Sequence, residues 1–260
     1  TVGQVMDSFI SGVPGAPLDK TVDTLKCGER ETTVSGMVTT MFPTLEIIEK
    51  TIALGANFII AHEPAFYNHL DETQWLQNDD VYRYKWDLLT KNNIAIWRNH
   101  DYIHRHVPDG VLEGVVNKLN WKPYQDTKES TVFHLPAQDL KTLIQKVKSS
   151  LGISALRYIG DLSHSCRKIL LLPGAYGGRR HIEAIGATKP DVLLCGEIQE
   201  WETAEYIRDA RRKGQNISLI VMGHAVSEEP GAGYMAAWLK KNFPGVTTTH
   251  IPSQNPLLFL

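Results

Sequence analysis

The chain has 260 residues, 42% of them hydrophobic, which is enough for one large α/β domain or two small ones. The formal net charge is -2 and both signs are interspersed, which provides no chain-wide field for nucleic acid or an anionic membrane. No run approaches the roughly 18 apolar residues that span a bilayer. A membrane span is therefore excluded, and nucleic acid is left only as a local partner.

The cysteines are three in number and widely separated, at Cys27, Cys166 and Cys195. None lies in a Cys-x-x-Cys spacing. This pattern favours buried free thiols in a reducing cytoplasm over a disulfide framework.

The first half of the chain alternates helix and strand patterns. Residues 1–10 place apolar side chains at helical spacing, and residues 32–40 form a β-branched run typical of a strand. The next expected helices are 44–54, 79–92 and 111–119, and the next expected strands are 58–61 and 94–97. This β-α-β-α-β order requires a parallel sheet with right-handed crossovers.

The polar stretch 124–130 is the best candidate boundary, and a second α/β series follows it. Its expected strands are 132–133, 156–159, 168–172, 191–195 and 218–222, and its expected helices are 140–151, 177–185, 200–212 and 231–242. We therefore predict two α/β lobes of related topology, 1–126 and 127–260. The segment from about residue 225 is expected to pack back on the first lobe.

Histidines and carboxylates follow three of the predicted strands. His62 and Glu63 come after one strand, Asp101 follows another, and His224 with Glu228 comes after a third. The carboxyl ends of parallel strands are where open α/β sheets keep their chemistry. Three such ends suggest one shared metal site.

Each segment also has a structural interpretation. His62 could cap its strand end through a backbone hydrogen bond, and Pro64 forces Glu63 into an extended conformation, so the two side chains diverge. If a helical turn begins near Asp101, the i,i+3 spacing places Asp101 and His104 on one face, while His100 and His106 point elsewhere. The alternative for this segment is a solvated polar loop.

His224 and Glu228 are spaced i,i+4, so they can meet on a helical turn, and a glutamate can bridge two cations. The alternative is an exposed loop whose acids complement a helix N-terminus. Glu197, at another strand end, could orient a ligand histidine or simply start a helix. The glycine- and arginine-rich residues 174–180 could hold a phosphate or form a flexible loop.

Four motifs together resemble a known family. They are Ile59-Ile60-Ala61-His62-Glu63-Pro64, Asn99-His100-Asp101, the segment 191–197 ending in Cys-Gly-Glu, and Gly223-His224-Ala225-Val226-Ser227-Glu228. Their order is similar to that of the Nif-three-like family, which comprises dinuclear metal-centre proteins often named as homologues of GTP cyclohydrolase I type 2. The resemblance implies that His62, Asp101, His224 and Glu228 bind two metal ions in a cleft between the lobes, with Glu228 as the bridge.

Two positions depart from the family pattern. Glu63 replaces the second histidine of a His-His-Pro motif, and Trp97 stands where a histidine usually opens the Asn-x-Asp motif. We expect Glu63 and His104 to complete the second site, or the second site to be empty. Exchanging imidazole for carboxylate favours harder ions such as Mn, Mg or Fe, with Zn still open.

The resemblance implies a metal-dependent hydrolase acting on a nucleotide, a phosphoester or a cyclic amide, because two bridged divalent cations activate water for displacement. It also implies a homo-oligomer, a hexameric toroid with sites facing an internal cavity. The competing hypothesis is a non-catalytic scaffold or regulatory protein whose ions stabilise a ring of subunits.

Overall fold

The computed structural model describes residues 1–258 and divides the chain into two compact units. Unit 1 combines Thr1–Glu113 with Gly231–Ser253, and unit 2 combines Gly114–Pro230 with the segment from Gln254. Each unit has a five-stranded sheet with helices, so the predicted α/β class is confirmed. The domain boundary expected at 126/127 stays a prediction. Within the described chain, no helix combines the length and apolar character that a bilayer span requires.

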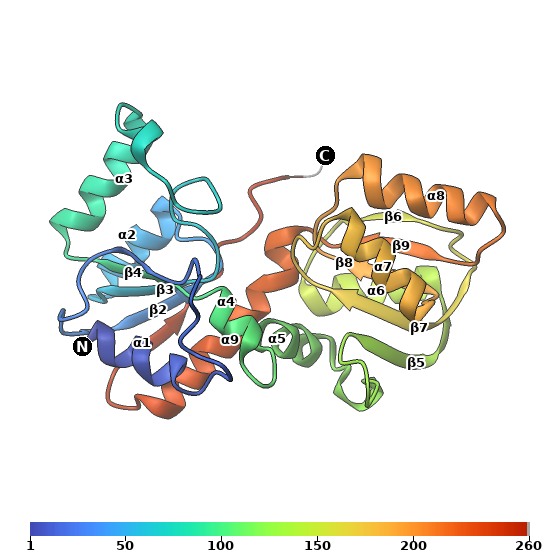
Figure 1. Ribbon diagram of the computed structural model, residues 1–260, viewed down its shortest axis with the longest axis horizontal. Helices are drawn as coiled ribbons and strands as arrows, with labels where there is room; N and C mark the ends of the chain where they lie inside the picture. The colour runs from blue at the N-terminus through green and yellow to red at the C-terminus, as the bar shows by residue number, and fades with distance from the viewer. Residues whose placement is uncertain (259–260) are drawn as a thin grey trace. The chain divides into compact units, whose positions relative to one another are not determined.

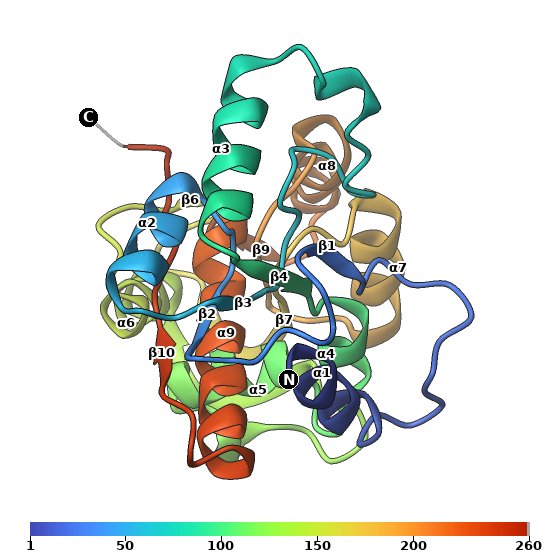
Figure 2. The same ribbon diagram turned by 90° about the vertical axis from the view of Figure 1, so that its left-hand side faces the viewer.

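The sheet of unit 1 has the strand order β1-β4-β3-β2-β10, which Figure 2 shows running from β10 on the left to β1 on the right. Its strands are β1 (Leu25–Cys27), β2 (Met37–Thr40), β3 (Phe58–Ala61), β4 (Ala95–Arg98) and β10 (Thr248–His250). All neighbours pair in parallel except β1, which runs antiparallel to β4. The two edge strands were not predicted, because three residues each give too short a pattern to identify.

Helices cover both faces of this sheet (Figure 1). One apolar cluster joins the sheet to α2 (Leu45–Ala53) and α3 (Asp80–Lys91). A second cluster, on the other face, includes α1 (Val2–Ile10), α4 (Asp101–Arg105) and the later part of α9 (His224–Asn242). The short 3-10 helix η1 (Gln74–Leu76) precedes α3, and α5 (Gly110–Leu119) follows α4.

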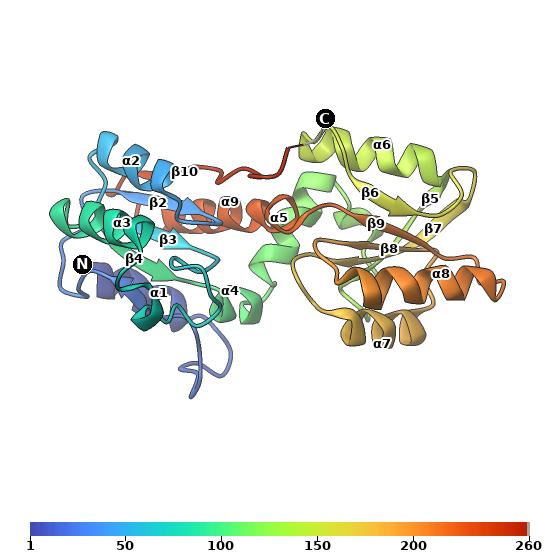
Figure 3. The ribbon, with the colours of Figure 1, turned by 90° about the horizontal axis from the view of Figure 1, so that it is seen from above.

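The sheet of unit 2 has the strand order β5-β7-β8-β9-β6, with a parallel centre of β7, β8 and β9 and an antiparallel strand at each edge. Its strands are β5 (Val132–Asp139), β6 (Arg157–Ile159), β7 (Ser165–Leu172), β8 (Val192–Cys195) and β9 (Ser218–Val221). Figure 3 shows α6 (Leu140–Leu151) on one face, and α7 (Gly178–Thr188) with α8 (Glu205–Arg212) on the other. The 3-10 helix η2 (Lys122–Tyr124) comes before β5, and the π-helical turn η3 (Glu200–Ala204) leads into α8.

The main difference from the predicted elements is the start of the last helix. We expected it at residue 231, because Pro230 was read as part of a turn, whereas α9 begins at His224 and continues through Pro230. A proline here removes one i→i-4 hydrogen bond but does not end the helix. His224 and Glu228 therefore lie on the first turns of a helix, and the expected i,i+4 geometry is present.

A buried lysine links α3 to the loop that follows β3. The Lys85 ammonium donates a 2.6 Å hydrogen bond to the Ala65 carbonyl and lies 5.7 Å and 5.4 Å from the ring centroids of Phe66 and Tyr67. Burial lowers the pKa of Lys85 to about 8, although nearby Asp71 acts in the opposite direction.

This pKa predicts a specific pH dependence of stability. Between pH 7 and pH 10 the unfolded chain retains the lysine proton while the folded chain loses it, so the stability of the wild type should rise with pH relative to Lys85→Met. We expect the difference in unfolding free energy between the two proteins to change by about 2 kcal/mol over this range. Urea unfolding at both pH values measures it, and a pH-independent difference would contradict it.

Candidate metal centre

The sequence places His62 and Asn99 at neighbouring strand ends in unit 1. β3 and β4 pair in parallel with Ala61 opposite Arg98, so the residues that follow leave the sheet side by side. The Asn99 amide donates to the Ala61 carbonyl at 2.8 Å, and Nδ1 of His62 lies 3.3 Å from the Asn99 carbonyl oxygen. The His62 side chain is thereby buried and fixed at the carboxyl edge of the sheet.

α4 begins immediately after β4 and is capped by a residue distant in sequence. The buried Asp23 carboxylate accepts hydrogen bonds from the amides of His100, Asp101 and Tyr102, at 2.9, 3.0 and 2.7 Å. Burial raises the pKa of Asp23, while these three bonds act to lower it. A carboxylate at a helix N-terminus also complements the helix dipole, so Asp23 fixes where α4 starts.

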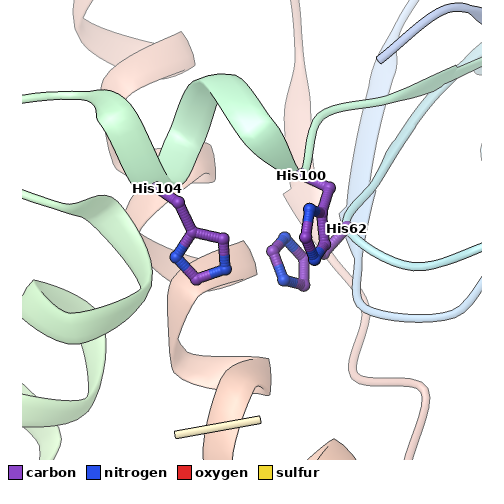
Figure 4. A group of neighbouring side chains, drawn as sticks. All are labelled: His62, His100 and His104. Carbon is purple, nitrogen blue, oxygen red and sulfur yellow. The ribbon is translucent and has the colours of Figure 1, made fainter. Parts of the chain in front are cut away.

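The start of α4 determines which histidines meet. His100 and His104 are separated by one helical turn, and both rings turn toward His62 (Figure 4). Ring centroids are 4.7 Å apart for His62 and His100, and 5.1 Å apart for each pair that includes His104. One ring nitrogen from each of the three lies within 4.8 Å of the others. We call these three residues the histidine cluster.

Each ring of the histidine cluster has its Nδ1 beside an oxygen atom. For His62 this is the Asn99 carbonyl; for His100 it is Asp101 Oδ1 at 2.9 Å, and for His104 it is Asp109 Oδ2 at 3.0 Å. Donation from Nδ1–H fixes the tautomer in which Nε2 carries the lone pair. Metal-binding histidines in proteins have this arrangement.

The charge state of His100 also suits a metal. Burial lowers the pKa of His100 to about 4, with a further contribution from the neighbouring His62, while the hydrogen bond with Asp101 acts in the opposite direction. His100 is therefore neutral at pH 7, which is the form that binds a cation.

Asp101 does not belong to the cluster but supports it. Besides His100, its carboxylate accepts hydrogen bonds from the Thr21 hydroxyl at 2.8 Å and the Val22 amide at 3.2 Å. Burial acts to raise the pKa of Asp101, but these bonds outweigh it and lower the pKa below its usual value. In this arrangement Asp101 orients a histidine.

The expectation that His100 would point elsewhere was wrong. The i,i+3 spacing of Asp101 and His104 predicted that these two share a face, whereas His100 and His104, spaced i,i+4, join His62 in the cluster. The His-x-x-x-His spacing was the signal that could have identified it. His106 does point elsewhere, since its ring stacks on Phe9 with centroids 5.3 Å apart.

Glu63 is buried beside a buried arginine. Its Oε2 accepts a hydrogen bond from Nη2 of Arg98 at 3.2 Å, and the Arg98 side chain is 1% exposed. The sequence predicted that the side chains of Glu63 and His62 diverge. Glu63 does contact Arg98, but one of its carboxylate oxygens also lies within 4.8 Å of a His62 ring nitrogen.

Unit 2 also holds a carboxylate–histidine group. The His224 ring has Nδ1 at 2.9 Å from Glu197 Oε2 and Nε2 at 2.9 Å from Glu228 Oε2. Glu197 therefore contacts a histidine, as one of its two interpretations proposed. Metal binding by His62, Glu63, Asp101, His104, His224 and Glu228 together stays a prediction.

Ser227 and Gly174 fix the position of Glu228 in unit 2. The Ser227 hydroxyl accepts from the Gly174 amide at 2.9 Å and donates to the His224 carbonyl at 2.8 Å. Gly174 has φ +77°, and a Cβ there would overlap the Glu228 carboxylate. The backbone approaches Glu228 closely because residue 174 has no side chain.

The loop 174–180 does not present a complete phosphate cradle. The Gly174 amide is bonded to Ser227, and the Gly178 amide at the start of α7 donates to Glu202 Oε2 at 2.8 Å. Arg179 pairs with Glu183 at 2.8 Å on the exposed face of α7. A carboxylate thus occupies the helix N-terminus that an anion would need.

The fold and the histidine cluster define an α/β protein with two units and a candidate metal centre in the first. The chain belongs to the Duf34/NIF3 (NGG1p interacting factor 3) family, whose model matches residues 21–256. The predicted family is therefore confirmed.

Curated relatives share about a quarter of their residues with this chain. A GTP cyclohydrolase 1 type 2 homolog of Clostridium acetobutylicum is 25% identical over 244 residues, covering 89% of this chain and 87% of the relative. One of Chlamydia pneumoniae is 26% identical over 247 residues, covering 89% of each.

Solved structures confirm the fold. A Bacillus cereus protein related to NIF3 has a TM-score of 0.80 at 16% identity, covering 100% of this chain and 99% of the other. A hypothetical protein of Staphylococcus aureus has a TM-score of 0.79 at 17% identity with the same coverage.

The contact between Asp109 and His104 yields a prediction. Asp109→Asn keeps the Oδ1 acceptor that bonds the amides of Val111 and Leu112, but its amide group cannot accept from Nδ1–H of His104. We expect metal affinity to fall about tenfold while the melting temperature changes little. Competition titration with a chelating indicator measures the affinity, and an unchanged affinity would argue against this orienting role.

The close approach of the Gly174 backbone to the Glu228 carboxylate yields another prediction. We expect Gly174→Ala to lower the unfolding free energy by about 2 kcal/mol more than Gly177→Ala does. Gly177 is a matched control, since it has φ +79° but no atom within 4 Å of an added Cβ. Equal losses in chemical denaturation would show that Glu228 tolerates the added methyl group.

Proposed function

We propose that this protein binds a divalent metal ion through His62, His100 and His104. The observation that supports this most strongly is the shared geometry of the three rings. Each has Nδ1 beside an oxygen atom, and one ring nitrogen of each lies within 4.8 Å of those of the other two. Three imidazoles suit Zn or Fe better than Mg or Ca. The chemistry of this donor set therefore fits a transition-metal ion.

We further propose that the metal supports hydrolysis. A divalent ion at such a site acts as a Lewis acid and polarises a carbonyl or phosphoryl oxygen. The relatives named GTP cyclohydrolase 1 type 2 homolog favour a nucleotide or a cyclic amide as the substrate class. The predicted hexameric assembly and a second metal ion stay proposals.

The chain's own residues have defined roles in this proposal. Asp101 and Asp109 hold the rings of His100 and His104, while the Asn99 carbonyl holds His62. In unit 2, His224 lies between the carboxylates of Glu197 and Glu228, with one ring nitrogen 2.9 Å from each. We assign His224 to proton transfer or, as the sequence predicted together with Glu228, to metal binding.

The experiment is metal analysis of purified protein after reconstitution with Zn, Fe or Mn. We expect stoichiometric metal in the wild type and at least a hundredfold weaker binding in His62→Ala and His104→Ala, because each change removes one of three ligands. His106→Ala is the matched control, since His106 follows α4 directly but stacks on Phe9. It should bind metal as the wild type does.

Two results would contradict the proposal in different ways. In the first, His62→Ala holds as much metal as the wild type, which would show that the histidine cluster is not the metal site. In the second, the wild type holds full metal, but neither histidine substitution changes the hydrolysis of GTP and related cyclic amides. This result would support metal binding and contradict the proposed hydrolase activity.

A further inference from the structure

We propose that unit 1 takes one metal ion, and that the Arg98 guanidinium is the fixed cation beside Glu63 where a second ion would otherwise be expected. The inference rests on the proposed metal binding by the histidine cluster. A carboxylate oxygen of Glu63 lies within 4.8 Å of a His62 ring nitrogen, so Glu63 is near enough to be considered as a ligand. The consequence of the inference is that Glu63 instead acts as the counter-ion of an arginine.

The Arg98 guanidinium is fixed in position by the main chain. Nε donates to the His62 carbonyl at 3.3 Å, and Nη1 donates to the His69 carbonyl. Both carbonyls belong to the loop that follows β3, so this loop wraps around a guanidinium with almost no exposed surface. Arg98 cannot move away from Glu63 without breaking both bonds.

Two buried carboxylates and more than one buried cation surround this position. Arg98 lies 3.2 Å from Glu63 and 3.8 Å from Asp71, and Asp71 also lies 3.3 Å from the Lys26 ammonium. The exposed fractions of these four side chains range from 1% to 9%. Buried Lys85 is a third cation that interacts with Asp71, so this group has no excess negative charge that would attract a further cation.

A second metal ion would add to the positive charge of this group. It would add two positive charges beside a guanidinium that stays protonated at every accessible pH. It would also compete with Arg98 for the Glu63 carboxylate and weaken the ion pair of the arginine. Because Arg98 is buried, losing part of its ion pair would cost much free energy.

β4 offers no other ligand for a second ion. Trp97, where the resemblance led us to expect a histidine, packs edge-on against Phe9 with ring centroids 6.0 Å apart. Its Nε1 donates to the Asp23 carbonyl at 3.4 Å, in the core on the α1 side of the sheet. The two departures from the family pattern, at residues 63 and 97, thus have one explanation: an ion pair and an apolar contact replace two imidazoles.

The test compares Glu63→Gln with Glu46→Gln, a control that loses an exposed ion pair with Lys50. If Glu63 balances Arg98, Glu63→Gln should keep its metal affinity within about threefold and lower the melting temperature of the metal-free protein by about 10 °C. Glu46→Gln should change neither quantity. The double variant Glu63→Gln/Arg98→Met should lose less stability than the sum of its single substitutions.

The second measurement is the number of metal ions bound per chain. The variant His224→Ala lacks the unit 2 histidine, so any metal ion that this histidine binds is lost. Native mass spectrometry of this variant with Zn²⁺ should show one ion per chain. Two ions per chain in this variant, or a loss of affinity of tenfold or more in Glu63→Gln, would overturn the inference. Absence of metal from the wild type would instead refute the proposed function, a result distinct from both.

Discussion

The parallel pairing of β3 with β4 is the constraint on which the histidine cluster depends. With Ala61 opposite Arg98, the chain must deliver His62 and Asn99 to the same edge of the sheet, and α4 must begin within two residues of that point. A shift of one residue in this register would turn every side chain of β4 to the other face. The Arg98 side chain would then point to the opposite face of the sheet, and the loop after β3 would lose the cation around which it folds. The apolar packing of Ile96 and Trp97 on opposite faces therefore fixes the register, and the register fixes the site.

Much of the fold could be predicted from the sequence, since long periodic segments specify their own structure. The runs that became β3, β8 and β9 are mostly apolar and buried throughout, and α2, α3 and α6 have clear apolar faces. Strands of three residues carry no such pattern, which is why β1 and β10 were missed. The start of α9 was misplaced because Pro230 is a strong local signal, and tertiary packing of the helix overrides it.

The site could be predicted less completely, for a different physical reason. The residue types were identified, but which of them meet depends on where α4 starts, and that is fixed by Asp23, a residue 77 positions away from His100. No local pattern connects the two. Likewise, the sequence indicated that Glu63 replaces an imidazole, but its ion pair with Arg98 depends on the register of β4 and on the path of the loop through His69. Local spacing gives candidates, and long-range hydrogen bonds select among them.

The segment from Thr21 to Asp23 has a consequence for the protein's energetics. Hydrogen bonds to two carboxylates hold this segment against α4. Asp23 accepts hydrogen bonds from backbone amides at the start of the helix, and Asp101, in the helix, accepts hydrogen bonds from Thr21 and Val22. Any ligand that binds the folded α4 more tightly than the frayed helix must also favour the ordered form of this segment, because binding free energy is shared between linked equilibria. This segment contacts the cluster through the backbone amide of His100 and is therefore thermodynamically coupled to the occupancy of the cluster. A substitution far from the histidines, at Thr21 for example, can weaken ligand affinity while every ligand atom stays in place.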